Sequence, residues 1–346
     1  MLSFASDYVE GAHPAILQRF IDTNLVKQAG YGSDEYTASA REKIKAACAC
    51  PEADVWFLTG GTQTNQVVID SLLLPYEGVV AAETGHIAAH EAGAIEFTGH
   101  KVLTVPHRAG KMTAADLSAY LATYHADDNA EHMVRPGAVY ISHPTEYGTL
   151  YTKEELTALR RVCDEYEIPL FMDGARLGYG LAAPDTDVTL RDLCALCDVF
   201  YIGGTKVGAL FGEAVVIMNE KYKKDFRFMI KQRGGMLAKG RLLGIQFDTL
   251  FTDDLYTKIA RNANDMAYQI RDIFVSNGYP LLFDSPTNQQ YPIISDEELA
   301  ILGKDFGYEY WERVDETHSG VRFCGSWATT QEQVDALREA VNALKK

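Results

Sequence analysis

The sequence predicts an α/β fold in which a mostly parallel sheet lies between helices, followed by a smaller α+β domain. The main observation is that short β-branched or aromatic runs alternate with longer helical patterns from Asp54 to Asn219. Such alternation is typical of a parallel sheet covered on both faces. The pattern changes after about residue 245, and 346 residues are enough for two domains. We therefore expect a large domain with an N-terminal arm over residues 1–245 and a small domain over residues 246–346.

Seven runs in the large domain are predicted to be strands. In order, they are DVWFL, GVVAAE, KVLTV, AVYISH, PLFMD, DVFYIGG and EAVVIM. The helices between them are predicted to begin near Thr62, His86, Thr113 and Lys153. Thr152 precedes the last of these helices and Glu155 stands three residues later, which is the spacing of a capping box. Open α/β sheets bind ligands beyond the carboxyl ends of their strands, so polar residues at those ends are candidates for a site.

The C-terminal part begins with a long helical stretch, roughly from Gly244 to Asn277. It continues with PLLFDSPTNQQYPII, GYEYWERV and SGVRFCGSW and ends with the predicted helix TQEQVDALREAVNALKK. No internal repeat or low-complexity linker separates the two parts. We therefore expect them to pack tightly against each other.

The composition predicts a soluble, cytoplasmic protein that binds neither nucleic acid nor a membrane. The net charge of −16 disfavours an anionic partner, although a local basic patch can still bind a phosphate. The segment MLSFASDYVEG has no basic run followed by an apolar one, and apolar stretches are broken well before the length of a membrane span. The six cysteines are predicted to be buried, reduced thiols, because the pair Cys194 and Cys197 lacks a second pair for zinc.

Lys206 is the first candidate functional residue. It follows the apolar run VFYI and lies in the segment GGTKVG, so its neighbours are small. The nearest acidic residues in the sequence are Asp198 and Glu213. A lysine with few counterions loses its proton more readily, and a neutral amine is a nucleophile. The pattern predicts an amine placed for covalent chemistry.

Two more polar clusters follow predicted strands. The segment TGGTQTN, residues 59–65, joins a strand to a helix, and its backbone N–H groups and hydroxyls suit a phosphate. It lacks the lysine of a P-loop and the third glycine of a dinucleotide motif, which disfavours a nucleotide site and leaves a plain structural turn open. Asp173 ends another strand, where it either pairs with Arg176 or faces a cation such as a protonated pyridine nitrogen.

Taken together, the three clusters predict a pyridoxal 5'-phosphate site. A phosphate cradle, a carboxylate for the ring nitrogen and a lysine for the aldehyde are the parts that such a site requires. The lysine would form a Schiff base with the cofactor, and its small neighbours would leave room for the ring. This hypothesis explains why the chain brings an amine to the end of a buried strand.

The chain resembles the threonine aldolase and β-eliminating lyase group of fold-type I pyridoxal-phosphate enzymes. The resemblance runs nearly end to end and rests on an ordered set of motifs, which are SD at residues 6–7, YGSDEYT, TGGTQTN, HIAAHEAGA, MDGAR, CDVFYIGGTK, RGGM and VRF. The ordered set is far more specific than any one motif. It implies the fold-type I architecture and a pyridoxal-phosphate-dependent lyase.

The resemblance also implies which residues bind the cofactor. Lys206 would be the Schiff-base lysine, Asp173 the partner of the pyridine nitrogen, and His86 the residue stacked on the ring. The phosphate would be held by Gly61 and Thr62, with Thr205 as a weaker candidate.

For the substrate, the resemblance implies a carboxylate clamp in which Arg322 is the main residue and Ser6 takes part. A guanidinium matches the two oxygens of a carboxylate. Arg176 would lie beside the cofactor and share in the same contact. From its spacing alone, Arg322 is also compatible with a surface or interdomain salt bridge.

His86 and His90 stand four residues apart and are predicted to share a helical face. The spacing suits a metal, but Glu91 lies outside the pair, so H-E-x-x-H is absent. We predict no metal site and a packing role for His90, where the family commonly carries an aromatic residue.

One segment departs from the family pattern. Many threonine aldolases read ENTHNG after the fourth strand of the large domain, where this chain reads HPTEYG at residues 143–148. The second active-site histidine of the family therefore aligns with Glu146. Since that position handles the substrate hydroxyl, the exchange leaves open a different β-hydroxy amino acid or a different reaction on the same cofactor.

We expect an aldolase that cleaves the Cα–Cβ bond of a β-hydroxy-α-amino acid, such as threonine or allo-threonine, to glycine and an aldehyde. The base for the hydroxyl would be His86, Glu146 or an ordered water, and Glu146 would need a raised pKa to act well near neutral pH. The alternatives are another lyase, a racemase or an aminotransferase on the same scaffold. A cofactor-binding protein without turnover is disfavoured by the predicted clamp of Ser6 and Arg322.

The resemblance further implies a homodimer or a homotetramer whose active sites are shared between subunits. The expected contributors are YGSDEYT, residues 31–37, and KQRGGMLAKG, residues 231–240. The second segment is basic and rich in glycine, which suits an approach to a phosphate across an interface. A solvated basic turn is the alternative.

Overall fold

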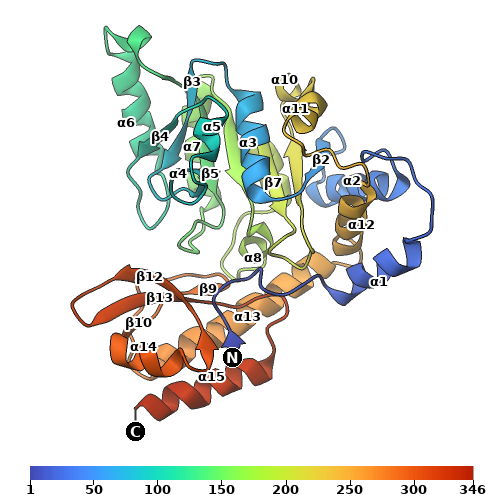
Figure 1. Ribbon diagram of the computed structural model, residues 1–346. Coiled ribbons are helices and arrows are strands. Elements are labelled where there is room, and N and C mark those ends of the chain that lie inside the picture. The colour runs from blue at the N-terminus through green and yellow to red at the C-terminus, as the bar shows by residue number, and fades with distance from the viewer. Residues whose placement is uncertain (346) are drawn as a thin grey trace.

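The computed structural model of the protein describes residues 1–345, which form a large α/β part and a smaller C-terminal part (Figure 1). The large part contains a seven-stranded sheet in the order β2-β8-β7-β6-β5-β3-β4. All seven strands predicted from the sequence are present. They are β2 (Asp54–Leu58), β3 (Glu77–Ala82), β4 (Val102–Val105), β5 (Arg135–Ser142), β6 (Leu170–Asp173), β7 (Val199–Gly203) and β8 (Glu213–Ile217).

One strand of this sheet runs against the others. β8 pairs antiparallel with both β2 and β7, whereas the remaining neighbours pair in parallel. The prediction of a mostly parallel sheet is confirmed. Because β8 is reversed, its first residue, Glu213, lies opposite Leu58 at the end of β2 and Gly203 at the end of β7. The start of β8 therefore belongs to the edge of the sheet where the parallel strands end.

Helices cover both faces of the sheet, and buried apolar side chains form one cluster on each face. The helices of the large part are α1 (Pro14–Thr23), α2 (Glu35–Cys48), α3 (Gly61–Leu72), α4 (His86–Ala89), α5 (Ala94–Phe97), α6 (Ala114–His125), α7 (Lys153–Glu165), α8 (Leu177–Leu181), α9 (Leu190–Leu196), α10 (Glu220–Lys223), α11 (Phe226–Gln232) and α12 (Arg241–Leu250), with a 3-10 turn at Ala130–His132. α3 and α11 contribute to one cluster, and α2, α6, α7, α9 and α12 contribute to the other.

Two of the longer helices, α7 and α6, begin with an N-terminal capping residue. Thr152 and Glu155 form the predicted capping box of α7, with the Glu155 N–H donating to the Thr152 hydroxyl at 3.1 Å and the Thr152 N–H donating to Glu155 Oε2 at 2.8 Å. Thr113 caps α6 through the N–H of Asp116. Each cap satisfies a backbone donor that the first turn of a helix would leave unpaired.

Two helix predictions are corrected. The long helical stretch predicted from Gly244 to Asn277 is two helices, α12 and α13 (Leu255–Ser276). They are separated at Asp253 and Asp254, whose φ angles of +52° and +56° end a right-handed helix. The helix predicted from His86 is a single turn, because α4 stops at Ala89 and Ala92 has a φ of +51°.

The smaller part packs an antiparallel sheet against three helices, and its core is a separate apolar cluster. In this sheet β13 lies between β10 and β12, and β9 also pairs with β13. The elements are α13, β9 (Gln289–Gln290), β10 (Ile293–Ser295), α14 (Asp296–Leu302), β11 (Phe306–Gly307), β12 (Glu309–Arg313), β13 (His318–Cys324) and α15 (Gln331–Leu344).

The N-terminal arm ties the two parts together. β1 (Leu2–Ser3) pairs in parallel with β11, and the Cys324 N–H donates to the Phe4 carbonyl at 2.7 Å. Further along, α1 is joined to α12 by an ion pair between Arg19 and Asp248 at 2.7 Å. The proposed boundary between the large and the small domain, between residues 245 and 246, falls inside α12, which packs on α2.

Two further findings bear on the composition. All six cysteines carry free thiols, and five are buried while Cys194 is partly exposed. Within residues 1–345, no helix is both long enough and apolar enough to pass through a membrane.

Candidate active site

The three predicted clusters meet in one cavity of about 250 Å³ at the carboxyl edge of the sheet. Its walls include Gly60–Thr62 at the start of α3, Asp173 at the end of β6, and Lys206 after β7. An adjoining cavity of about 210 Å³ also contains Lys206 and extends to Arg322 on β13. Both cavities are lined by Tyr8, His86, Glu146, Arg176 and Lys206. The three clusters that the sequence places at strand ends, Gly60–Thr62, Asp173 and Lys206, therefore lie in the same cavity.

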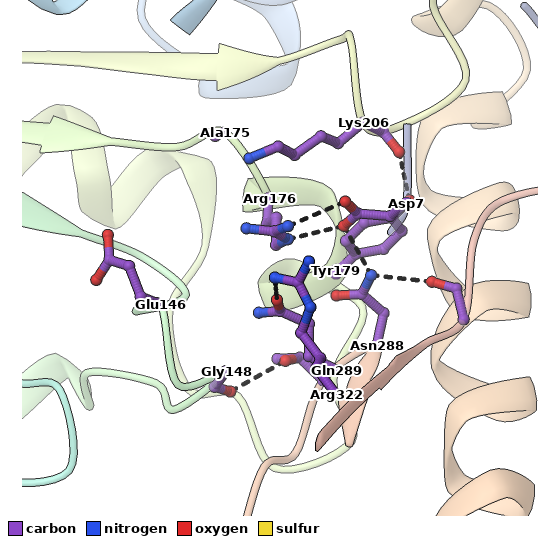
Figure 2. A network of polar contacts seen from close by, with 12 residues as sticks. Asp7, Glu146, Gly148, Ala175, Arg176, Tyr179, Lys206, Asn288, Gln289 and Arg322 are labelled. Carbon is purple, nitrogen blue, oxygen red and sulfur yellow. Dashed lines mark hydrogen bonds and ion pairs between the residues drawn. The ribbon is translucent and has the colours of Figure 1, made fainter. Parts of the chain in front are cut away.

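Lys206 lines the cavity together with Ala175 and Arg176, and Figure 2 shows the three residues. No carboxylate of residues 1–345 forms an ion pair with this amine, which lies over the Tyr8 ring, 5.9 Å from the ring centre. Burial and the Arg176 guanidinium lower the pKa of Lys206, although nearby carboxylates oppose the shift. A larger share of neutral amine is the condition for a lysine nucleophile.

Asp173 is buried, with 4% of its surface exposed, and four groups donate to its carboxylate. Oδ2 accepts from the Tyr140 hydroxyl at 2.6 Å and from the Asn65 amide at 3.1 Å. Oδ1 accepts from the Tyr201 hydroxyl and from the Ala175 N–H at 2.9 Å. Burial alone would raise the pKa of Asp173, but the neighbouring His86 and the hydrogen bonds from Tyr140, Tyr201 and Ala175 lower it. The site therefore contains an ionised carboxylate.

Arg176 does not pair with Asp173, which was one of the two interpretations of the sequence. It binds Asp7 of the N-terminal arm through two hydrogen bonds, from Nε at 2.7 Å and from Nη2 at 3.0 Å (Figure 2). Asp7 also accepts from the Asn288 amide at 2.9 Å. Burial would raise the pKa of Asp7, but Arg176 and Lys206 lower it to about 2. The arm thus supplies a charged partner that holds Arg176 beside Lys206.

The predicted phosphate cradle is the start of α3, where backbone N–H groups have no partner in the helix. Gly61 is its first residue, and a side chain there would come within 3.3 Å of the Tyr201 hydroxyl. Thr205 lines the same cavity, but its hydroxyl donates to Glu213 Oε1 at 2.7 Å and accepts from the Gly212 N–H at 2.9 Å.

His86 borders both cavities, and one third of its side chain is exposed. Its Nδ1 lies 2.7 Å from Glu91 Oε1, and Glu91 also accepts from the Asn65 amide at 2.7 Å. Asn65 in turn contacts Asp173, so a chain of buried polar groups joins the His86 ring to that carboxylate. His90 is not on a helix shared with His86, but the two rings are still 5.7 Å apart between centres.

Glu146 lies across the cavity from Lys206 and is 8% exposed (Figure 2). Its Oε1 accepts from the Ser142 hydroxyl at 2.6 Å and from the His86 N–H at 3.0 Å. Burial raises the pKa of Glu146, and the hydrogen bonds only partly offset this effect. A carboxyl group whose pKa lies closer to neutral pH can exchange a proton in either direction.

Arg322 lies at the far end of the second cavity. Its guanidinium donates to Gln289 Oε1 at 3.0 Å and to the Ala5 carbonyl at 3.1 Å, pairs with Glu309, and lies over the Trp311 ring. The salt bridge of the alternative interpretation is therefore present, and the carboxylate clamp stays a prediction. The Ser6 hydroxyl is buried and has no partner among residues 1–345, and the same holds for the Arg322 Nε.

The sequence did not single out five of these residues: Asn65, Glu91, Tyr140, Tyr201 and Glu213. Tyr201 had a signal, since a hydroxyl in a buried strand next to the lysine needs a polar partner. Asn65 and Glu91 lie within motifs that the sequence identified, but their contacts join segments that are distant in sequence. Glu213 reaches the site only because β8 is reversed.

The chain is similar to known proteins over its full length. A model of the family described as β-eliminating lyase matches residues 3–326. A low-specificity L-threonine aldolase from Pseudomonas sp. (strain NCIMB 10558) is 30% identical over 347 residues, which cover 99% of this chain and 97% of that protein. A protein of the same description from Pseudomonas aeruginosa is 30% identical over 337 residues, 96% of this chain and 95% of that one.

The chain is also similar to solved structures. A threonine aldolase from Leishmania major is 42% identical, with complete coverage of both chains and a TM-score of 0.97. A histidinol-phosphate aminotransferase from Clostridium acetobutylicum is 13% identical with a TM-score of 0.74 over 100% of this chain and 99% of that one, which shows a shared fold alone. The family match runs from the N-terminal arm past β13 and includes every candidate site residue. The chain therefore belongs to the β-eliminating lyase family and has the fold of the fold-type I pyridoxal-phosphate enzymes.

Proposed function

We propose that the protein is a pyridoxal-phosphate-dependent aldolase that cleaves a β-hydroxy-α-amino acid of the threonine or allo-threonine type to glycine and an aldehyde. The observation that carries the proposal is the placement of the Lys206 amine, with its lowered pKa, in one cavity with the ionised Asp173 and the start of α3. The threonine aldolases that are similar over the whole chain support the same reaction.

The residues of the first cavity fit the cofactor. Lys206 would hold it through its amine, Gly61 and Thr62 would hold its phosphate, and His86 would cover its ring. Asp173 would keep a proton on the ring nitrogen, since its carboxylate is charged and held from four sides. When bound, pyridoxal phosphate supplies an aldehyde for amines and a ring that withdraws electrons from the bond that breaks.

The residues of the second cavity suit an amino-acid substrate. Arg322 would bind the carboxylate, and the unpaired Ser6 hydroxyl would add a hydrogen bond. Glu146 faces the same space and would take the proton of the β-hydroxyl, with His86 or an ordered water as the alternative base. Its raised pKa supports this role, because a base works best when its pKa is near the working pH.

We expect Glu146→Gln to lower kcat about 10²-fold or more and to remove the acidic limb of the pH profile of kcat. A carboxyl group acts as a base only when ionised, so wild-type kcat should fall as the pH drops through its raised pKa. Glutamine keeps an oxygen that can accept from Ser142 and His86 but has no proton to exchange. The measurement is steady-state kinetics across the pH range. An acidic limb that persists with the same midpoint would assign the base to His86 or to water.

We expect Arg322→Lys to raise KM roughly tenfold or more with a smaller effect on kcat, because a point charge replaces a planar fork. Arg313→Lys is the matched control, since Arg313 is half exposed on the neighbouring strand β12 and pairs with Asp296 outside both cavities. The measurement is the kcat and KM of both variants with the same substrate. An unchanged KM for Arg322→Lys would transfer the clamp to Arg176.

The proposed function is tested by incubating the holoenzyme with a panel of β-hydroxy amino acids and assaying glycine and aldehyde together. Equal amounts of both products support the aldolase. Products that do not include glycine identify another lyase. Conversion of one enantiomer of the substrate to the other identifies a racemase, and a reaction that requires a keto acid identifies an aminotransferase. A Lys206→Ala protein assayed beside it shows whether the cleavage belongs to this site.

The protein is further proposed to form a homodimer or homotetramer with shared active sites. Residues 31–37 and 231–240 pack together in one chain, where the Tyr31 N–H donates to the Ala238 carbonyl at 3.2 Å. Lys239 is exposed there, whereas Arg233 pairs with Asp70 of its own chain. Lys239 is therefore the better candidate for a contact with a neighbour's phosphate.

We expect Lys206→Ala and Lys239→Ala proteins, each inactive alone, to regain activity when their subunits exchange. In a hybrid, one site receives the intact Lys206 from one subunit and the intact Lys239 from the other. The assay is turnover after mixing under exchange conditions, with each protein alone as control. Shared sites are contradicted if Lys239→Ala is fully active by itself, or if freely exchanging mixtures stay inactive.

A further inference from the structure

Glu213 is a buried acid that the proposed function leaves without a role. It is the first residue of the reversed strand β8 and is 3% exposed. It lines the same cavity as Gly60–Thr62 and Lys206, and it lies opposite Leu58, two residues before Gly60. The carboxyl group thus stands beside the segment that is proposed to hold the cofactor phosphate.

The contacts of Glu213 connect it to Thr205. Its Oε2 accepts from the Gly204 N–H at 3.1 Å, and its Oε1 accepts from the Thr205 hydroxyl at 2.7 Å. The Gly212 N–H donates to that same hydroxyl at 2.9 Å. In this arrangement the single hydroxyl proton of Thr205 points to Glu213 and is withheld from the cavity.

An ionised Glu213 would oppose a bound phosphate, because like charges repel strongly in a buried site. The titratable groups that face Glu213 are Lys206, Asp173, Tyr201 and Tyr256. The two tyrosines have raised pKa values and add no charge, Lys206 favours the ionised carboxyl, and Asp173 disfavours it. Burial is the largest effect and raises the pKa of Glu213 to about 8.

We infer that Glu213 carries a proton when the cofactor phosphate is bound, and that this proton turns the Thr205 hydroxyl toward the phosphate. The neutral carboxyl group donates to Thr205 Oγ, which still accepts from Gly212 and now donates its own proton to a phosphate oxygen. The Thr205 hydroxyl then donates one hydrogen bond and accepts two, and the protonated Glu213 oxygen donates one. Both groups have the capacity for these bonds. Glu213 is a positioning residue here, and the inference rests on the proposed cofactor.

The consequence is a phosphate affinity that depends on pH. Above the pKa of Glu213, the protein must take up one proton to bind the phosphate, so the affinity falls by up to about tenfold for each unit of pH. Below that pKa the carboxyl group is already neutral, so the affinity does not change with pH. An amide in place of the carboxyl group is neutral at every pH and should not show the loss.

The test measures binding of pyridoxine 5'-phosphate and of inorganic phosphate to the full-length, cofactor-free protein by calorimetry between about pH 7 and pH 9.5. Pyridoxine 5'-phosphate has an alcohol in place of the aldehyde, so it cannot react with Lys206. We expect wild-type affinity to fall about fivefold from pH 8 to pH 9, and Glu213→Gln to remove that loss. Glu77→Gln is the matched control, a buried acid at the start of β3 that should keep wild-type behaviour.

A second measurement needs no variant. Calorimetry of the wild-type protein near pH 8.5, in two buffers of different ionisation enthalpy, should show uptake of about one proton for each inorganic phosphate bound. Absence of proton uptake overturns the inference, as does a parallel loss of affinity in wild type and Glu213→Gln. In either case normal binding of pyridoxine 5'-phosphate would leave the cofactor assignment intact. If the wild-type protein bound pyridoxine 5'-phosphate at no pH, the proposed function would be contradicted, and so would the inference that rests on it.

Discussion

Lys206→Ala is expected to reduce turnover by roughly 10³-fold or more while the protein stays folded. The amine stands alone among the residues of the cavity as a nucleophile for an aldehyde, and the hydroxyl and carboxyl groups around it cannot replace it. Removing it also removes a buried, poorly paired charge, so folding should not suffer. The measurement is the rate of glycine and aldehyde formation, together with the thermal midpoint of unfolding.

The cofactor content of the same variant separates binding from chemistry. The start of α3 should still retain some cofactor without a covalent bond, which dialysis and absorbance can quantify. Lys221→Ala is the control, because Lys221 is exposed on α10 and lies outside both cavities. A Lys206→Ala protein with ordinary turnover would show that another amine reacts.

Asp173→Asn is expected to lower kcat by about 10²-fold or more while the cofactor remains partly bound. The amide has nearly the same shape, and the tyrosine hydroxyls around it can turn to accept from its NH₂ group. It carries no charge, however, so it cannot hold a proton on a pyridine nitrogen, and electron withdrawal by the ring becomes weaker. Kinetics and cofactor absorbance on one sample measure the two effects.

Asp192→Asn serves as the comparison for this change, since Asp192 caps α9 and lines neither cavity. It should leave kcat unaltered and affect stability alone. If Asp173→Asn turned over at the normal rate, the aspartate at the end of β6 would be a structural residue, and its four hydrogen bonds would serve only to satisfy a buried carboxylate.

Local signals explain why much of this molecule can be predicted from its sequence. Strand runs such as DVWFL and PLFMD carry their own periodicity, and Thr152 caps α7 with a residue three positions away. The rule that sites gather at the carboxyl ends of strands then brings Gly61, Asp173 and Lys206 together without any long-range information.

The remaining features depend on contacts between distant segments. The direction of β8 is set by its pairing with β2 and β7, which no local pattern encodes, so Glu213 could not be placed at the site. The partner of Arg176 is Asp7, which is 169 residues away in the chain. The turn between α12 and α13 looked helical because aspartate is compatible with a helix as well as with a positive φ.

Lys206 is proposed to be the amine that binds the cofactor, and the most direct test of this assignment is chemical. Borohydride reduction of the holoenzyme fixes the cofactor to the lysine that holds it, and peptide mapping by mass spectrometry identifies that lysine. We expect a yellow protein that loses its colour on reduction and carries one label for each chain, on the peptide that contains Lys206. A label on another lysine, or a reduced protein without any label, would contradict it.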